Sequence, residues 1–388
     1  MTPTQNALAI TSAKLSATAN SSVKFMIIQA NSAVIGNKLI GLVNLEIIDG
    51  KIRAVNVGSA SKPDQIIDGT LIPGFIDIHC HGGASSYFSN ASKVQDVIRV
   101  HRDHGTTGIV ASLVTESIDD LKKQIATLVP FYTSGQILGI HLEGPYLSHA
   151  RCGAHEPTLL INPDTAEIKE LLEVGAGSIA MITIAPELPG AIEAIKYLSS
   201  AGVKVAIGHT NGDFKDAAAG TNAGATVVTH FLNAMSKERV EGSISSFVLV
   251  DERLSVELIL DGHHVPFTTA SEIIQAIGNR VVLVTDAMAA AGSGDGNYAI
   301  GKLEVKVENS VARLTSNNAL AGSTLTMDQA FNNAINNCGV SIPQAVLMSS
   351  TNPAHALGLS DRGSIAVGYR ADLLAFDSVT GKVSTLNL

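Results

Sequence analysis

Histidine and carboxylate side chains stand at the ends of short apolar runs in this 388-residue chain. His79 and His81 end the run FIDIHCHG, and residues two apart on a strand point to the same face. Glu143 ends the run ILGIHLEG, where an ionised carboxylate is seldom buried without a partner. A metal cation is one partner that would satisfy all three groups.

Three further runs end in the same way, VKVAIGHT on His209, ATVVTHFL on His230 and VVLVTDAM on Asp286. Taken singly, each histidine could be a core residue that is hydrogen-bonded to the backbone. Four imidazoles and two carboxylates at strand ends of one domain instead predict a metal centre. Mixed histidine and carboxylate ligands suit Zn, Fe or Mn better than Ca or Mg.

Hydrolysis is the chemistry that such a centre supports, because a bound divalent metal lowers the pKa of water toward about 7. The reaction also needs a group that takes a proton from the water and gives one to the leaving group. Asp286 is the only carboxylate that ends the last run, so it is the candidate proton shuttle. The alternative is that Asp286 orients a ligand histidine.

Eight apolar runs, separated by helix-like segments, must position these residues. The runs cover residues 75–82, 107–114, 137–144, 179–186, 203–210, 225–232, 255–262 and 281–288. This alternation predicts an α/β fold, a (β/α)8 TIM-like barrel, in which functional groups stand at the C-terminal ends of the strands. A hairpin at 302–316 and further helices are expected after the eighth strand.

Both chain ends are rich in β-type sequence. Residues 23–72 include IDGKI, where Asp49 and Gly50 between apolar runs predict a hairpin turn. We expect residues 23–72 and 362–388 to form one small β-sandwich domain and residues 73–361 to form the barrel. Residues 1–22 lack a basic start and a continuous apolar stretch, so we expect a flexible leader rather than a signal peptide.

Composition limits the class of partner and the compartment. The net charge of −9 without a basic run argues against nucleic acid, and no apolar stretch reaches the roughly 18 residues of a membrane span. The cysteines Cys80, Cys152 and Cys338 show no C-x-x-C spacing and cannot all pair, which predicts a reduced, cytoplasmic protein.

Six motifs carry a resemblance to a known family. PGFIDIHCHGG, HLEGPYL, GHTN, HFLNAM, DGHHV and VTDAMAAAG occur in this order, and together they resemble the N-acetylglucosamine-6-phosphate deacetylases of the amidohydrolase superfamily. The resemblance runs from about Lys24 to the C-terminus. It implies hydrolysis of the acetamide of an amino-sugar phosphate by a homodimer with one or two divalent metal ions per subunit. Zn is the first choice, with Fe or Mn as alternatives.

The resemblance also implies roles for the metal ligands. Glu143, His209 and His230 match the core ligands of the family. His79 and His81 match a second metal position that only some members keep, and both histidines are present in this chain.

Catalytic and substrate-binding roles follow from the same resemblance. Asp286 matches the general base and acid, and His155 matches the histidine that helps to polarise the acetyl carbonyl. His264 and Arg239 match the residues that hold the substrate phosphate, partly across the dimer interface; Arg253 is a second candidate, and Arg239 could instead be a solvated surface charge. Other positions matched to substrate contacts are Gly144, Asn233, Ala234, Ala321 and Gly322.

Several residues are expected to have supporting roles only. His141 is expected to support Glu143, and Cys80 to point away from the flanking histidines into packing. His101 and His104, on the helix after the first run, are expected at the surface.

Three other functions are alternatives. A deacetylase for the galactosamine epimer would use the same machinery. A cyclic-amide hydrolase commonly has a carboxylated lysine on the fourth strand, and IAMITIAP contains no lysine. An inactive scaffold would lack a ligand or Asp286, and none is missing.

Overall fold

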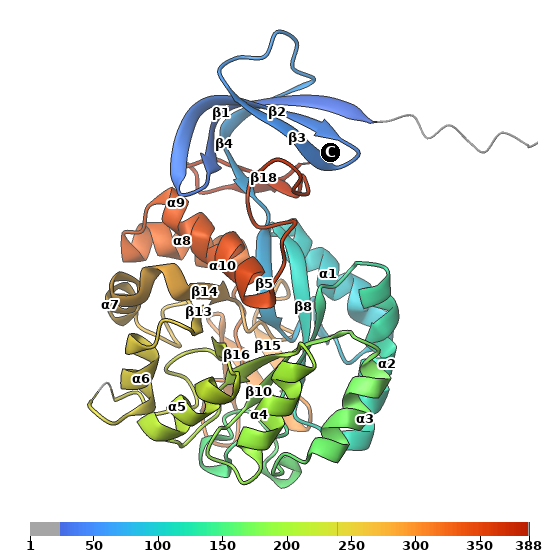
Figure 1. The fold of residues 1–388 in the computed structure, drawn as a ribbon, viewed down its shortest axis with the longest axis vertical. Helices are drawn as coiled ribbons and strands as arrows, with labels where there is room; N and C mark the ends of the chain where they lie inside the picture. The colour runs from blue at the N-terminus through green and yellow to red at the C-terminus, as the bar shows by residue number, and fades with distance from the viewer. Residues whose placement is uncertain (1–23, 239, 387) are drawn as a thin grey trace, which may run out of the picture.

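The computed structural model describes residues 24–238, 240–386 and 388. Figure 1 shows two parts along the long axis of the molecule, a β domain at one end and a barrel of strands and helices at the other. The predicted leader, residues 1–22, and Arg239 lie outside the described residues.

Eight parallel strands form the barrel wall, and they follow one another around it in chain order. They are β5 (Phe75–Cys80), β8 (Thr106–Val114), β9 (Gly139–Glu143), β10 (Ile179–Ile184), β11 (Lys204–Ile207), β12 (Val227–Val228), β13 (Ser255–Ile259) and β14 (Val281–Val284). A parallel bridge between Cys80 and Ala287 joins the first strand to the segment after the last. Each predicted run overlaps one of these strands, so the predicted barrel is confirmed.

Helices cover the outside of this wall (Figure 1). They are α1 (Val94–Asp103), α2 (Ile118–Thr133), α3 (Thr165–Gly175), α4 (Ala191–Ser200), α5 (Phe214–Ala223), α6 (Ile244–Val250), α7 (Phe267–Ile277), α8 (Met327–Cys338), α9 (Ile342–Val346) and α10 (Asn352–Leu357). Side-chain caps begin several of them; Asp213, for example, accepts from two amides at the start of α5. Within the described residues, no helix is both long and apolar enough to cross a membrane.

The β domain is one six-stranded sheet with the order β19-β18-β4-β1-β2-β3. Its strands are β1 (Phe25–Ile35), β2 (Lys38–Ile48), β3 (Lys51–Val57), β4 (Gln65–Pro73), β18 (Leu373–Phe376) and β19 (Val383–Thr385). The predicted turn joins β2 to β3, with positive φ at Asp49 and Gly50. Because β18 pairs with β4, both chain ends contribute to one small β domain, as predicted.

An insert follows the last barrel strand and differs from the expected hairpin. It has three antiparallel strands, β15 (Gly296–Ile300), β16 (Leu303–Glu308) and β17 (Val311–Leu314). The strand β15 is mostly exposed and has the sequence GNYAI, so it lacks the apolar run that would have marked it in the sequence. The insert packs on Met288 and Ala290 through its own apolar cluster, beside the barrel mouth.

His101 does not lie at the surface, and that prediction is wrong. It is 1% exposed, because it continues the buried stripe Val94, Val97 and Ile98 on the face of α1 that packs on the barrel. Its Nε2 lies 2.9 Å from the carbonyl oxygen of Gly82. Burial lowers the pKa of His101 to about 4, so the ring is neutral.

Cys80 points away from the two histidines that flank it in the sequence, as predicted. Its Sγ lies 3.2 Å from the Nε2 of His101 behind the barrel wall. The alternation along β5 therefore separates His79 and His81 from the thiol.

A pH-dependent contact links α1 to α8. The Nδ1 of His104 lies 2.9 Å from Asp328, and this hydrogen bond raises the pKa of His104 above its ordinary value. A raised folded-state pKa stabilises the protein below the unfolded value of about 6.5, and this contribution is lost as pH rises through the folded value. We expect His104→Ala to lower the free energy of unfolding by up to about 1 kcal/mol near pH 5.5, and by less near pH 8.5.

Denaturant unfolding at the two pH values measures this difference. His149→Ala is the matched control, because His149 is exposed. An equal loss for His104→Ala at both pH values would contradict the prediction.

Candidate active site

The predicted metal ligands converge at the C-terminal end of the barrel. The residues brought together are each at most 7% exposed: His79, His81, Glu143, His209, His230 and Asp286. All of them except the fully buried His79 line a cavity of about 240 Å³. Spacing along the chain thus becomes proximity in space, because the carboxyl ends of parallel strands meet at one edge.

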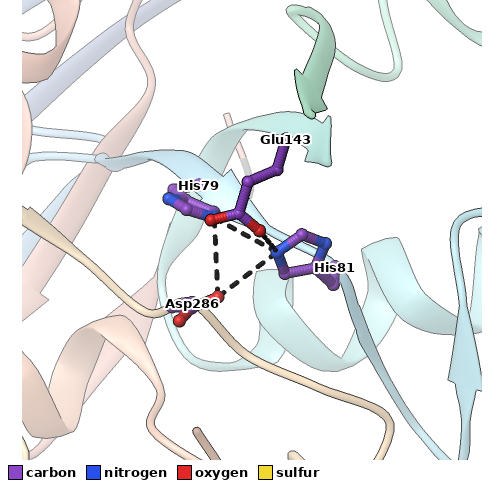
Figure 2. A group of neighbouring side chains, drawn as sticks. All are labelled: His79, His81, Glu143 and Asp286. Carbon is purple, nitrogen blue, oxygen red and sulfur yellow. Dashed lines mark hydrogen bonds and ion pairs between the residues drawn. The ribbon is translucent and has the colours of Figure 1, made fainter. Parts of the chain in front are cut away.

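The first group of side chains consists of His79, His81, Glu143 and Asp286, and Figure 2 shows their polar atoms facing one another. The Nε2 of His81 lies 3.1 Å from the Nε2 of His79, 3.0 Å from Glu143 Oε2 and 3.3 Å from Asp286 Oδ1. Ligand atoms around a tetrahedral ion with bonds of 2.0–2.1 Å lie about 3.3 Å apart. The first group therefore fits a divalent cation.

The second group consists of Glu143, His209 and His230. Glu143 Oε1 lies 3.1 Å from the Nε2 of His209 and 3.0 Å from the Nε2 of His230, and the two Nε2 atoms are 3.0 Å apart. Glu143 therefore belongs to both groups and presents one oxygen mainly to each.

The charges around these groups favour a cation at their centre. Burial disfavours the protonated form of His79, but Glu143, Glu257 and Asp286 outweigh burial and raise the pKa of His79 well above its usual range. Burial likewise disfavours ionised Glu143, yet His79 and the neighbouring imidazoles hold its pKa well below the usual range. The buried carboxylates therefore favour positive charge at this site, and a divalent cation would supply it.

Hydrogen bonds set which nitrogen of each ring carries its proton. The Nδ1–H of His209 donates to the carbonyl oxygen of Arg151 at 2.9 Å, which leaves the Nε2 lone pair toward Glu143. His155 has the opposite tautomer, because its Nδ1 accepts a hydrogen bond from the backbone N–H of Thr115 at 3.3 Å. Burial lowers the pKa of His155 to about 4, so the ring is neutral and carries its proton on Nε2. In the structure the Nε2–H of His155 lies 3.3 Å from Glu143 Oε2 at the cavity wall, so His155 is a hydrogen-bond donor there, whereas His209 has the tautomer of a metal ligand.

His141 takes no part as a ligand in this arrangement. Its Nδ1 lies 3.0 Å from Ser112 Oγ and its Nε2 2.8 Å from Thr183 Oγ1, so both nitrogens are occupied. Its ring meets the ring of His79 edge-on, with centroids 4.6 Å apart. His141 was expected to support Glu143, and it does so indirectly, by packing against the ring of His79.

The backbone is in a left-handed conformation at three of the six converging histidine and carboxylate residues. His209, His230 and Asp286 each come two residues after a strand and have φ values of 48°, 27° and 47°. Such conformations cost on the order of 1–3 kcal/mol each and persist only where the surroundings hold them. At Asp286 the amide donates to His79 O at 2.9 Å, and the carbonyl accepts from Ser323 at 2.8 Å.

Several predicted substrate-binding residues line the cavity. His264 does so with its Nδ1 held at 2.7 Å by Asp261 Oδ2, which leaves Nε2 as the free ring nitrogen. Asn233, Ala234 and Gly322 line it as well.

Other predicted positions are placed differently. Gly144 and Ala321 are buried beside the cavity without lining it, and Arg253 is hydrogen-bonded to Asp251 outside it. Lys237 also lines the cavity, and no sequence motif predicts this position, because the course of its loop depends on tertiary contacts.

Comparisons with known proteins agree with this geometry. The family model described as "Amidohydrolase family" matches residues 70–387. The chain is 35% identical over 345 residues to the N-acetylglucosamine-6-phosphate deacetylase of Lysinibacillus sphaericus, covering 85% of this chain and 88% of that protein. It is 34% identical over 343 residues to the N-acetylgalactosamine-6-phosphate deacetylase of Escherichia coli O157:H7, covering 86% and 90%.

A solved structure from Mycobacterium smegmatis is also similar. It is an N-acetyl-D-glucosamine-6-phosphate deacetylase variant in complex with N-acetyl-D-glucosamine-6-phosphate. It superposes with a TM-score of 0.90 at 40% identity, covering 94% of this chain and 98% of that one. With the family match over residues 70–387, these findings show that the chain belongs to the amidohydrolase family.

Proposed function

We propose that this protein is a metal-dependent deacetylase that hydrolyses N-acetyl-D-glucosamine 6-phosphate to D-glucosamine 6-phosphate and acetate in amino-sugar catabolism. One observation supports the proposal above all. A single cavity is lined by the candidate metal ligands, by the carboxylate of Asp286 and by the N–H donor of His155. Two relatives with this activity in their names are 35% and 40% identical over most of the chain.

The donor set supports a divalent metal, for which Zn is the first choice and Fe or Mn the alternatives. Glu143, His209 and His230 would hold one ion, and His79 and His81 a second. When bound, such an ion supplies Lewis acidity, which lowers the pKa of water toward about 7 and polarises an oxygen.

The chain's own residues then handle protons and charge. Asp286 takes the proton of the water that adds to the acetyl carbon, and returns it to the amine nitrogen as the C–N bond breaks. The Nε2–H of His155 donates to the carbonyl oxygen while negative charge develops there. Acetate and a free amino sugar are the products.

The substrate phosphate is proposed to lie between His264 and Lys237. Lys237 is the only lysine or arginine that lines this cavity among the residues described. Arg239, two residues further along the chain, is proposed to bind the substrate phosphate across a homodimer interface. A cytoplasmic location is also part of the proposal, and the three unpaired cysteines support it.

His264→Ala is expected to lower kcat/KM for the phosphorylated substrate by about 10- to 100-fold, because a charge-assisted hydrogen bond is worth roughly 1.5–3 kcal/mol. Turnover of N-acetylglucosamine without the phosphate should change little. Steady-state kinetics on both compounds tests this, with exposed His263→Ala as the matched control. Equal losses on both compounds would contradict a phosphate contact.

Acetate release from the two hexosamine epimers tests the function itself. The metal-loaded protein is expected to show the higher kcat/KM on N-acetyl-D-glucosamine 6-phosphate. A preference for the galactosamine epimer would favour the second candidate, which the 34% identity to the Escherichia coli enzyme supports. No acetate from either epimer would refute the deacetylase proposal.

A further inference from the structure

We propose that Glu257 is a positioning residue of the metal centre, which fixes the tautomer and orientation of His79 and so controls ion binding at His79 and His81. This inference rests on the proposed metal-dependent function. Glu257 is the third residue of β13, within the otherwise apolar run SVELILDG. It is 0% exposed, and a carboxylate at such a place is costly without partners.

One carboxylate oxygen of Glu257 contacts a member of each ligand group. Its Oε2 accepts the Nδ1–H of His79 at 2.9 Å and the backbone N–H of His230 at 3.0 Å. The second contact holds the segment in which His230 adopts its φ of 27°. Glu257 thus orients one ring directly and the other through its backbone.

The contact to His79 decides which nitrogen is free to bind metal. When Nδ1 carries the proton that Glu257 accepts, the neutral ring has its lone pair on Nε2. That atom lies 3.1 Å from the Nε2 of His81 and 3.5 Å from Glu143 Oε1, inside the first group. The opposite tautomer would present a proton to the site and exclude a cation.

The hydrogen bonds of the imidazole Nδ1 atoms distinguish a positioning role for Glu257 from a role in core packing alone. Each group has one imidazole with an anchored Nδ1: His209 on the carbonyl of Arg151, and His79 on Glu257. Among the described residues, the Nδ1 atoms of His81 and His230 have no hydrogen-bond partner. Without Glu257, the first group would therefore have no fixed tautomer.

The other oxygen of Glu257 supports the same conclusion. Oε1 has no hydrogen-bond partner within the described part of the chain. A buried carboxylate that served only to stabilise the core would be expected to have both oxygens satisfied. All the hydrogen bonding of this group is instead directed at His79 and His230.

Zn²⁺ titration of the metal-free protein, with metal analysis after dialysis, tests the inference. Glu257→Met, of similar length, is expected to weaken binding of one ion by about 10- to 100-fold, so that one Zn²⁺ per subunit is lost. Glu257→Gln keeps an oxygen that can accept both N–H groups, so it should retain part of that affinity. Val282→Ala is the matched control, because Val282 is the register partner of Glu257 on β14 and lowers stability by core truncation alone.

Selective loss of one ion in Glu257→Met, with partial retention in Glu257→Gln, is the supporting result. Wild-type Zn²⁺ stoichiometry and affinity in Glu257→Met, with only a lower melting temperature, would overturn the inference. So would an equal loss of Zn²⁺ in Val282→Ala. A wild-type protein that binds no Zn²⁺, Fe²⁺ or Mn²⁺ would instead overturn the proposed function, so the two failures are distinct.

Discussion

Replacement of Asp286 by asparagine is expected to lower kcat by about 10²- to 10⁴-fold, the usual contribution of a general acid–base group. Asparagine has the same shape and keeps one oxygen toward His81, which lies 3.3 Å from Oδ1 in the structure. It cannot accept and return a proton. The loss should therefore fall on kcat rather than on KM, and the metal content should stay near that of the wild type.

Acetate release under saturating substrate, with metal analysis of the same preparation, measures this. Asp77→Asn is the matched control: Asp77 is a fully buried barrel carboxylate that bonds Thr285 Oγ1 at 2.6 Å and does not line the cavity. Near-wild-type kcat in Asp286→Asn would remove the residue from the proton pathway. It would leave the alternative role, in which Asp286 only orients a ligand histidine.

Strand-end residues were predictable from the sequence because barrel geometry converts order along the chain into convergence in space. Each run that ended on a histidine or a carboxylate had to deliver that side chain to the same edge. Glu143 and His209, 66 positions apart in sequence, thus have ligand atoms 3.1 Å apart.

Residues whose role depends on partners from other elements were not predictable in this way. The donor tautomer of His155 depends on the amide of Thr115, which no spacing rule connects to it. Glu257 is unusual in the sequence because it is a charged residue within an apolar run. Its position in the middle of a strand does not predict a function, because the function depends on its contact with His79. The burial of His101 could have been predicted from its helical spacing to Val94, Val97 and Ile98. Its polar side chain instead suggested a surface position.

Replacement of Glu143 by glutamine is expected to have the largest effect of the proposed substitutions. Glu143 presents Oε1 to His209 and His230 and Oε2 to His81. Glutamine replaces one of these oxygens with an NH₂ group, which cannot ligate a metal and would point hydrogens at imidazole lone pairs. It also removes the negative charge that both ligand groups share.

Because a metal Lewis acid contributes several kcal/mol to such a reaction, we expect kcat/KM to fall by at least about 10³-fold, with loss of bound metal. Chelation of the wild type should lower activity similarly, and added Zn²⁺ should restore it, whereas the Glu143→Gln variant should not recover. Glu187→Gln is the matched control, since the hydrogen bonds of Glu187 within the described residues go to the loop after His209, through Thr210 and Asn211. If Glu143→Gln kept its metal and its activity, neither ligand group would depend on the shared carboxylate, and the cation site would have to lie elsewhere in the barrel.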